Sequence, residues 1–213
     1  MPTLVLSPLV LLAALLTIRA EYRGPRWQVY LFKPLTTALI FAIALDRAPA
    51  GPRAYAIAIL IGLLCSLAGD IFLMLPADRF IAGLVSFLLA HIAYIVAFST
   101  APGATLSWRS AALLFPLLLY GAVVFRRLRP TLGALAPPVL VYMLVIIVMA
   151  WRALDLWAQV RTPSALAAAL GALLFVASDS LLALNRFAGK FAAAQALVLG
   201  TYYTAQWLIA LSI

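Results

Sequence analysis

The sequence predicts an all-α fold, a polytopic bundle of eight transmembrane helices in a single integral membrane domain over residues 1–213. Three observations predict it. Hydrophobic residues make up 67% of the chain and charged residues only 10%, too little polar surface to coat a water-soluble globule of this size. The apolar runs match the roughly 20 residues that a helix needs to cross a bilayer. They also lack the short alternating segments of a membrane β-barrel.

Short connections rich in Pro, Gly and Arg separate the apolar segments. We predict membrane helices over residues 3–20, 30–46, 54–75, 79–99, 109–126, 133–151, 164–184 and 191–212. The first has no basic residue before it and is followed by Arg19, so we expect a membrane helix there and not a cleaved signal peptide. The single cysteine, Cys65, excludes an internal disulfide framework.

The net charge of +9 comes from basic residues between the apolar runs, so we attribute it to membrane topology and expect no nucleic-acid partner. The first, third, fifth and seventh connections hold Arg19, Arg23, Arg26, Lys33, Arg79, Arg126, Arg127, Arg129, Arg186 and Lys190. The other connections hold Arg47, Arg53, Arg109, Arg152 and Arg161. The larger group should face the cytoplasm, with both termini on the opposite side.

Two predicted helices carry an isolated aspartate near the same end, Asp70 in "SLAGDIFLML" and Asp179 in "FVASDSLLAL". Each follows a Gly by eight residues and an Ala by two, and precedes an Arg-Phe pair. One explanation is a tandem repeat of four helices plus four, which would return both acids to the same membrane face. The other is a chance likeness of two helices, because similarity elsewhere is faint.

Both acids should lie roughly 8 to 10 Å below the cytoplasmic boundary, at 1.5 Å of rise per residue. An ionised carboxylate inside a membrane is costly, and burial favours the neutral form. Such a pair could therefore hold a proton at neutral pH. The structural alternative is that each Asp only bonds a neighbouring helix.

Other polar residues are expected at the same depth. Lys33 begins a helix with Thr36 and Thr37 on its face and is either a phosphate ligand or a lysine that snorkels to the interface. Asp78 with Arg79, and Asn185 with Arg186, occupy matching turns; they are ordinary turn residues or, for the cations, a phosphate site.

The only histidine, His91, lies within an apolar helix with Phe87, Tyr94 and Phe98 on its face, either as a core residue or as a working one. A polar stripe on the last helix consists of Gln195, Tyr202 and Gln206. It either joins helices or lines a hydrated cavity.

The sequence has no serine-hydrolase elbow, zinc-protease motif, Walker loop or dinucleotide fingerprint. We therefore expect no cofactor. One histidine excludes a zinc site built from several, although carboxylates could still bind another ion.

The segments "FKPLTT", "LAGDIFLML", "FLLAHIAYIVAF", "LLFVASDSLLALNRF" and "YYTAQWLI" occur in this order, and in them the chain resembles the YhhN-like membrane proteins, whose characterised relatives are lysoplasmalogenases. The resemblance implies hydrolysis of the vinyl ether bond of a lysophospholipid, releasing a fatty aldehyde and a glycerophospho-base. It implies a multi-pass membrane protein. In a bacterium we expect the inner membrane, and the distribution of basic residues predicts that the active site faces the cytoplasm.

Acid cleavage of a vinyl ether needs a proton donor and an anion, a division of labour that two carboxyl groups perform in glycoside hydrolysis. Asp70 and Asp179 are the candidate pair. The candidates for phosphate are Lys33 and Arg186, and those for water or headgroup are His91, Asn185, Tyr202 and Gln206. The rival hypothesis is a lipid or proton-coupled transporter, in which buried acids bind and release protons. The oligomeric state is left open.

Overall fold

The structure is a computed structural model that describes residues 2–77, 79–105 and 110–213. Its helices are α1 Pro2–Arg23, α2 Arg26–Arg47, α3 Arg53–Met74, α4 Phe80–Thr100, α5 Ala111–Leu132, α6 Ala136–Val160, α7 Pro163–Ala183 and α8 Ala194–Leu211. A 3-10 turn, Gly133–Leu135, joins α5 to α6, and a π-helical segment, Leu184–Ala188, follows α7. Asp78, Arg109 and the expected start of a helix at 109 lie outside the described residues.

The boundary expected between the fifth and sixth helices is wrong. We expected a loop at Arg126, Arg127 and Arg129, but α5 runs through them to Leu132. Arginine is a good helix former whose long side chain reaches the interface from within a helix, so a basic run does not mark the helix end. The chain turns instead at Gly133, whose φ of 51° suits a residue without Cβ.

Several further charged residues expected in connections lie inside helices. Arg152 belongs to α6, which continues nine residues past the expected end at 151. Its guanidinium pairs with Asp155 one turn later, and both side chains are buried. Mutual neutralisation makes this tolerable within an apolar helix. Helix α2 begins at Arg26 instead of 30 and ends at Arg47 instead of 46, so both of these arginines are helical. Lys33 lies within this helix, as expected.

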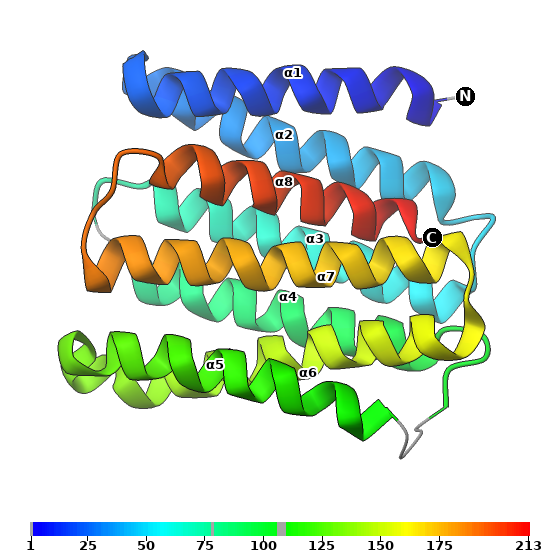
Figure 1. Ribbon diagram of the computed structural model, residues 1–213. Coiled ribbons are helices and arrows are strands. Elements are labelled where there is room, and N and C mark those ends of the chain that lie inside the picture. The colour runs from blue at the N-terminus through cyan, green and yellow to red at the C-terminus, as the bar shows by residue number, and fades with distance from the viewer. Residues whose placement is uncertain (1, 78, 106–109) are drawn as a thin grey trace.

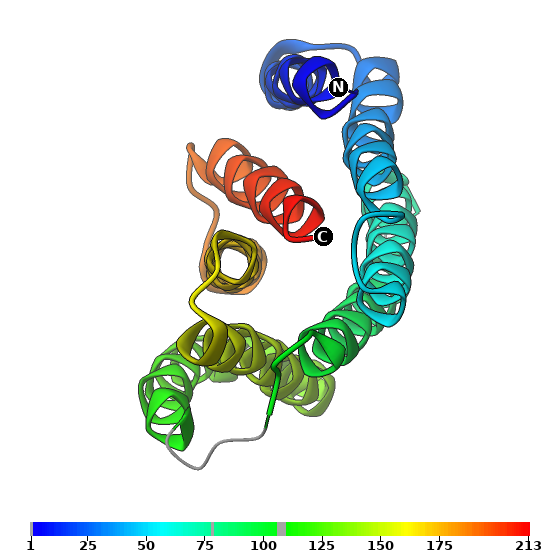
Figure 2. The same ribbon diagram turned by 90° about the vertical axis from the view of Figure 1, so that its right-hand side faces the viewer.

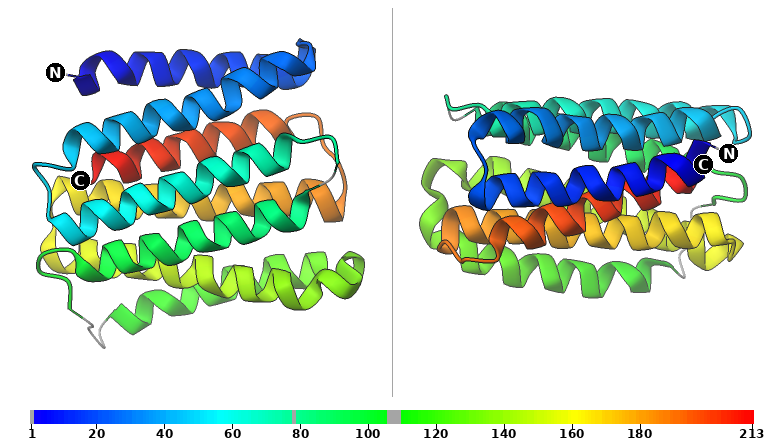
Figure 3. Two further views of the ribbon diagram at one scale, coloured as in Figure 1. Left: turned by 180° about the vertical axis from the view of Figure 1, so that it is seen from behind. Right: turned by 90° about the horizontal axis from the view of Figure 1, so that it is seen from above.

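The helices form a closed ring seen end-on (Figure 2). Around it, α1, α2, α3, α4, α6, α7 and α8 each pack against the next, and α8 returns to α1 and α2. Helix α5 lies outside the ring, against α6 and the π-helical segment. The view from behind shows α2, α3 and α4 as one layer in front of α7 and α8 (Figure 3).

The turns after α1, α3, α5 and α7 gather at one end of the bundle, and both chain termini lie at the other (Figure 1). Asp70 and Asp179 each lie four residues before the last residue of their helices, Met74 and Ala183. Both acids therefore lie near the same end, as the sequence predicts.

The outer surface of the bundle is apolar, with exposed side chains such as Leu4, Leu64 and Val123. In the described part of the chain, six helical stretches are long and apolar enough to cross a membrane, and one of them, Ala111–Val160, contains both α5 and α6. Helix α8 is not among the six. The expected all-helical, membrane-spanning class is thus confirmed, because such a surface needs an apolar solvent.

Candidate active site

A cavity of about 760 Å³ opens at the end of the bundle where α1 meets α2 and α7 meets α8. Exposed cationic residues, Arg26, Arg186 and Lys190, line its mouth, and the buried Asp70 lines its interior. Asp179 lines the same cavity. Two aspartates 109 residues apart in the sequence therefore face one hollow.

Asp70 is only 1% exposed and is held by two hydroxyl groups. Its Oδ2 accepts hydrogen bonds from Thr37 Oγ1 of α2 at 2.6 Å and from Tyr202 OH of α8 at 2.8 Å. Lys33, one helical turn before Thr37, interacts electrostatically with this carboxyl group and lines the cavity. The Lys33 and Thr37 spacing in "FKPLTT" therefore directs an ammonium and a hydroxyl group to one side of α2.

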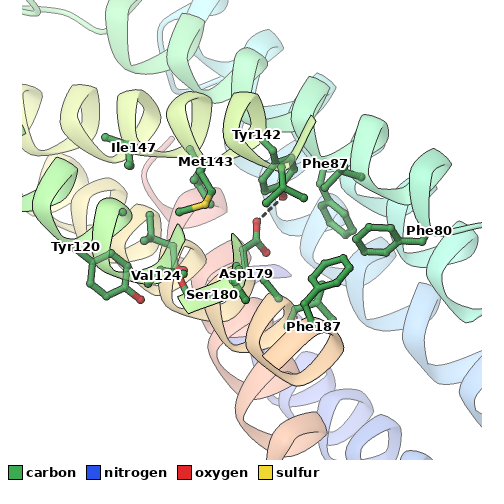
Figure 4. A pocket seen from close by; sticks show the side chains of 18 of the residues that line it. Phe80, Phe87, Tyr120, Val124, Tyr142, Met143, Ile147, Asp179, Ser180 and Phe187 are labelled. Atoms are coloured by element: carbon green, nitrogen blue, oxygen red, sulfur yellow. Dashed lines mark hydrogen bonds between the residues drawn. The ribbon is translucent and has the colours of Figure 1, made fainter. Parts of the chain in front are cut away.

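Asp179 is held differently, by a tyrosine and a histidine. Tyr142 OH of α6 donates a hydrogen bond to Asp179 Oδ2, as Figure 4 shows. His91 Nε2 of α4 lies 3.2 Å from the same oxygen and 2.9 Å from Tyr142 OH. The Tyr142 hydroxyl group and the His91 imidazole, both of which can carry a proton, thus meet at one oxygen of the Asp179 carboxyl group. The two aspartates therefore have unlike surroundings, as an acid and its partner require.

His91 is fully buried behind Asp179, with its ring edge-on to Phe175 at 4.7 Å between centroids. Its Nδ1 has no hydrogen-bond partner among the described residues. Gln206, also fully buried, accepts a hydrogen bond from Tyr94 OH at 2.6 Å. His91 and Gln206 do not line the cavity, whereas the other six candidate site residues do. Any effect of His91 or Gln206 on a ligand must therefore pass through Asp179 or through neighbouring side chains.

The loop after α7 carries Asn185 and Arg186 to the cavity wall. They lie in the π-helical segment and not in a tight turn, and π-helical bulges occur frequently at functional sites. The Arg186 guanidinium lies 4.0 Å over the ring of Phe80. The Asn185 Oδ1 accepts a hydrogen bond from the backbone N–H of Phe191 at 3.3 Å. Asn185 thus braces the loop that leads into α8.

Sequence reasoning missed Tyr142, which lies in the apolar run "LVYMLV" of α6. Tyr142 could have been found as a lone hydroxyl group within a predicted membrane helix, because a buried tyrosine hydroxyl group usually has a polar partner. Among the described residues, no group of three or more His, Cys, Asp or Glu side chains is arranged to hold a metal ion. The polar groups around the cavity include two carboxyl groups, their hydrogen-bond partners and nearby cations.

Comparison with known proteins gives a consistent set of relatives. Residues 28–213 match the model of the YhhN family. The chain is 32% identical to the uncharacterised membrane protein YhhN of Escherichia coli O6:H1 over 96% of both chains. It is 34% identical to bovine lysoplasmalogenase TMEM86A, over 89% of this chain and 79% of that one. It is 36% identical to human lysoplasmalogenase TMEM86B, over 70% and 60%. No solved structure matches the chain.

Proposed function

Because the chain belongs to the YhhN family of multi-pass membrane proteins, we propose that it is a membrane hydrolase that cleaves the vinyl ether bond of lysoplasmalogens. The products are a fatty aldehyde and a glycerophospho-base. Relatives that share about a third of its residues are named lysoplasmalogenases. The observation that carries the proposal is that Asp70 and Asp179 line one cavity whose mouth is cationic.

The proposed reaction uses one aspartate as acid and the other as base. The acid donates its proton to the outer alkene carbon, which leaves an oxocarbenium ion stabilised by the ionised partner. Water adds to the cationic carbon and gives a proton to that partner. The hemiacetal then loses its hydroxyl proton to the first carboxylate, while the second returns its proton to the departing glycerol oxygen. The carbon–oxygen bond breaks and both carboxyl groups regain their starting states.

The polar side chains of the cavity supply the binding functions. Lys33 and Arg186 are the proposed phosphate ligands, since both line the cavity that contains the acids and cations bind phosphate through charge-assisted hydrogen bonds. Tyr202 and Asn185 are the proposed contacts to water or headgroup from the same wall. His91 is proposed to act through Asp179, and Gln206 through Tyr94.

The test is the release of aldehyde from a lysoplasmalogen by the purified protein in detergent. We expect Asp70→Asn and Asp179→Asn each to lower the rate at least about a hundredfold, within the range for general acid–base groups, while remaining monodisperse. Asp46→Asn is the matched control, because Asp46 is exposed at the opposite end, in the last turn of α2. Full activity in both single variants would overturn the assignment.

A transporter is the second candidate, favoured by a repeated pattern of helix packing. Helix α3 packs on α4 as α7 packs on α8, and α4 packs on α6 as α8 packs on α2. Adding four to each helix number, and counting on from α8 to α1, converts the first packing pair of each comparison into the second. We propose that the chain is a tandem repeat of four helices plus four. Inverted or parallel repeats are common in transporters. Absence of aldehyde release together with lipid movement in vesicles would favour this candidate over the hydrolase.

The proposal also includes a topology. All of α1 to α8 cross the membrane, α8 as the shortest, with the cavity mouth toward the cytoplasm. In a bacterium the membrane is the inner one. The positive-inside rule supports this orientation, because Arg26, Arg186 and Lys190 lie at the mouth.

A further inference from the structure

A second cavity, of about 70 Å³, lies between α4, α5, α6 and α7. Figure 4 shows its wall, with Met143 and Ile147 of α6, and Tyr120 and Val124 of α5, around an interior that ends at Asp179. Nearly all of its lining side chains are apolar. Apart from Asp179 and its partner Tyr142, none of the residues that line this cavity has a role in the proposed reaction.

The two cavities share a wall. Both are lined by Leu73, Phe80, Phe87, Asp179, Leu182 and Phe187. Phe80 and Phe187 meet edge-to-face with their centroids 5.7 Å apart, and the Arg186 guanidinium covers Phe80. One side of this wall is polar and the other is apolar, so a ligand that reaches both must be amphipathic.

We propose that the apolar cavity binds the hydrocarbon chain of a single-chain lipid whose phosphate headgroup occupies the polar cavity. The inference rests on the proposed function, which it deepens by assigning the chain-binding site. Asp179 lies at the junction of the two cavities. A lipid that spans the junction has there the ether link between its glycerol and its chain, and the alkene carbon that a vinyl ether hydrolase must protonate lies two bonds from the oxygen of this link.

The remainder of the chain passes toward the membrane along α5. The cavity is too small for a long chain, but Tyr120 in its wall is 43% exposed, and its neighbours Leu119 and Val123 are also exposed. These side chains belong to the apolar outer surface, which is in contact with lipid. A chain can therefore enter sideways from the bilayer, and its buried segment gains about 0.8 kcal/mol of transfer free energy per methylene.

Gly121 of α5 lines the cavity and lets the Ile147 side chain of α6 pack against its backbone. A Cβ at this position would lie 2.5 Å from Ile147 Cδ1 of α6, so a larger residue must occupy the space between the two helices. Gly121→Leu should fill the cavity, and Ile147→Ala should widen it. Neither residue touches the polar cavity.

The test is photo-labelling of the full-length protein with a saturated 1-O-alkyl lysophosphocholine that carries a diazirine near its ether. This probe is not a substrate for vinyl ether protonation, so labelling does not depend on catalysis. We expect adducts within residues 120–128 and 139–147. Gly121→Leu should reduce them roughly tenfold, the loss expected for about two displaced methylene groups. Gly200→Leu, with nothing within 4 Å of its Cβ position, should leave them unchanged.

Ile147→Ala provides the opposite test and covers the case in which Gly121→Leu does not fold. It should increase labelling by a probe with a methyl branch near the diazirine, whereas Ile59→Ala, in the core away from both cavities, should not. Adducts confined to other helices would overturn the proposal. Correct adducts without aldehyde release by the wild-type protein would overturn the hydrolase and leave the chain site standing. Aldehyde release together with adducts elsewhere would support the hydrolase and overturn the chain-binding site.

Discussion

The two aspartates differ in the donors that hold them, and this difference is set residue by residue. Asp70 accepts hydrogen bonds from Thr37 and Tyr202, whereas Asp179 is held by Tyr142 and His91. Each thus has one tyrosine hydroxyl. The second partner is a threonine in one case and a titratable imidazole in the other. Removing a hydrogen-bond donor from such a carboxylate leaves the charge without a partner, which raises the free energy of the ionised form.

Tyr142→Phe is the sharpest test of this arrangement. The variant removes the hydroxyl shared by Asp179 and His91. A lost hydrogen bond to a charged group costs about 1.5 to 3 kcal/mol, so kcat for aldehyde release should fall roughly 10- to 150-fold. Tyr55→Phe is the control, since it removes a buried bond to Ser212 Oγ at 2.6 Å near the other end. Equal kcat in both variants would contradict the role.

Lys33→Met tests the headgroup site. The ammonium lines the cavity at 8% exposure, and its loss should raise KM for a lysoplasmalogen roughly tenfold, because cations bind phosphate through charge-assisted hydrogen bonds. Arg53→Met, at the exposed start of α3, is the control. An unchanged KM would remove Lys33 from the headgroup site.

At the scale of elements, the shared glycines of the two acidic helices allow each hairpin to close. A Cβ at Gly62 would lie 2.2 Å from Tyr94 Cε1 of α4. A Cβ at Gly171 would lie 2.9 Å from the Ala205 carbonyl oxygen of α8. Small residues that let backbones approach are the usual basis of helix packing in membranes.

Gly171→Ala should therefore destabilise the α7–α8 hairpin by about 1 to 3 kcal/mol, the usual cost of overpacking. The backbone of α8 is the obstacle, and it cannot turn aside as a side chain can. Gly200→Ala, within the same hairpin but facing open space, should have little effect. The measurement is the melting temperature of the protein in detergent, which is monitored by size-exclusion chromatography after heating. Matching temperatures for the two variants would contradict close packing at Gly171.

At the scale of the whole molecule, the ring of helices encloses a polar cavity inside an apolar exterior. The cavity mouth and the turns after α1, α3, α5 and α7 lie at one end, and the chain termini lie at the other (Figure 1). Orientation in the membrane therefore decides which side of the bilayer supplies water and releases the headgroup product.

Cysteine labelling in intact bacteria tests this orientation. In a Cys65→Ala background, Lys190→Cys should react with a membrane-impermeant maleimide only after the cells are opened. Ala50→Cys should react from outside. Positions 190 and 50 are both exposed, and they belong to the connections after α7 and after α2, which lie at opposite ends of the bundle (Figure 1). The reverse pattern would place the cavity mouth outside the cell and would refute the cytoplasmic site.

The sequence by itself determined the class, the approximate helices and the position of the two acids near the ends of their helices, because hydropathy and helical rise depend only on the local chain. It did not determine where α5 ends, since Arg126, Arg127 and Arg129 suit a loop and a helix equally. Nor did it reveal Tyr142, whose importance comes from a partner 37 residues away. The convergence of Asp70 and Asp179 on one cavity, and the apolar cavity beside it, were decided by tertiary structure alone. Both depend on which helices become neighbours in the ring, and that follows from side-chain packing between distant segments, which no local pattern records.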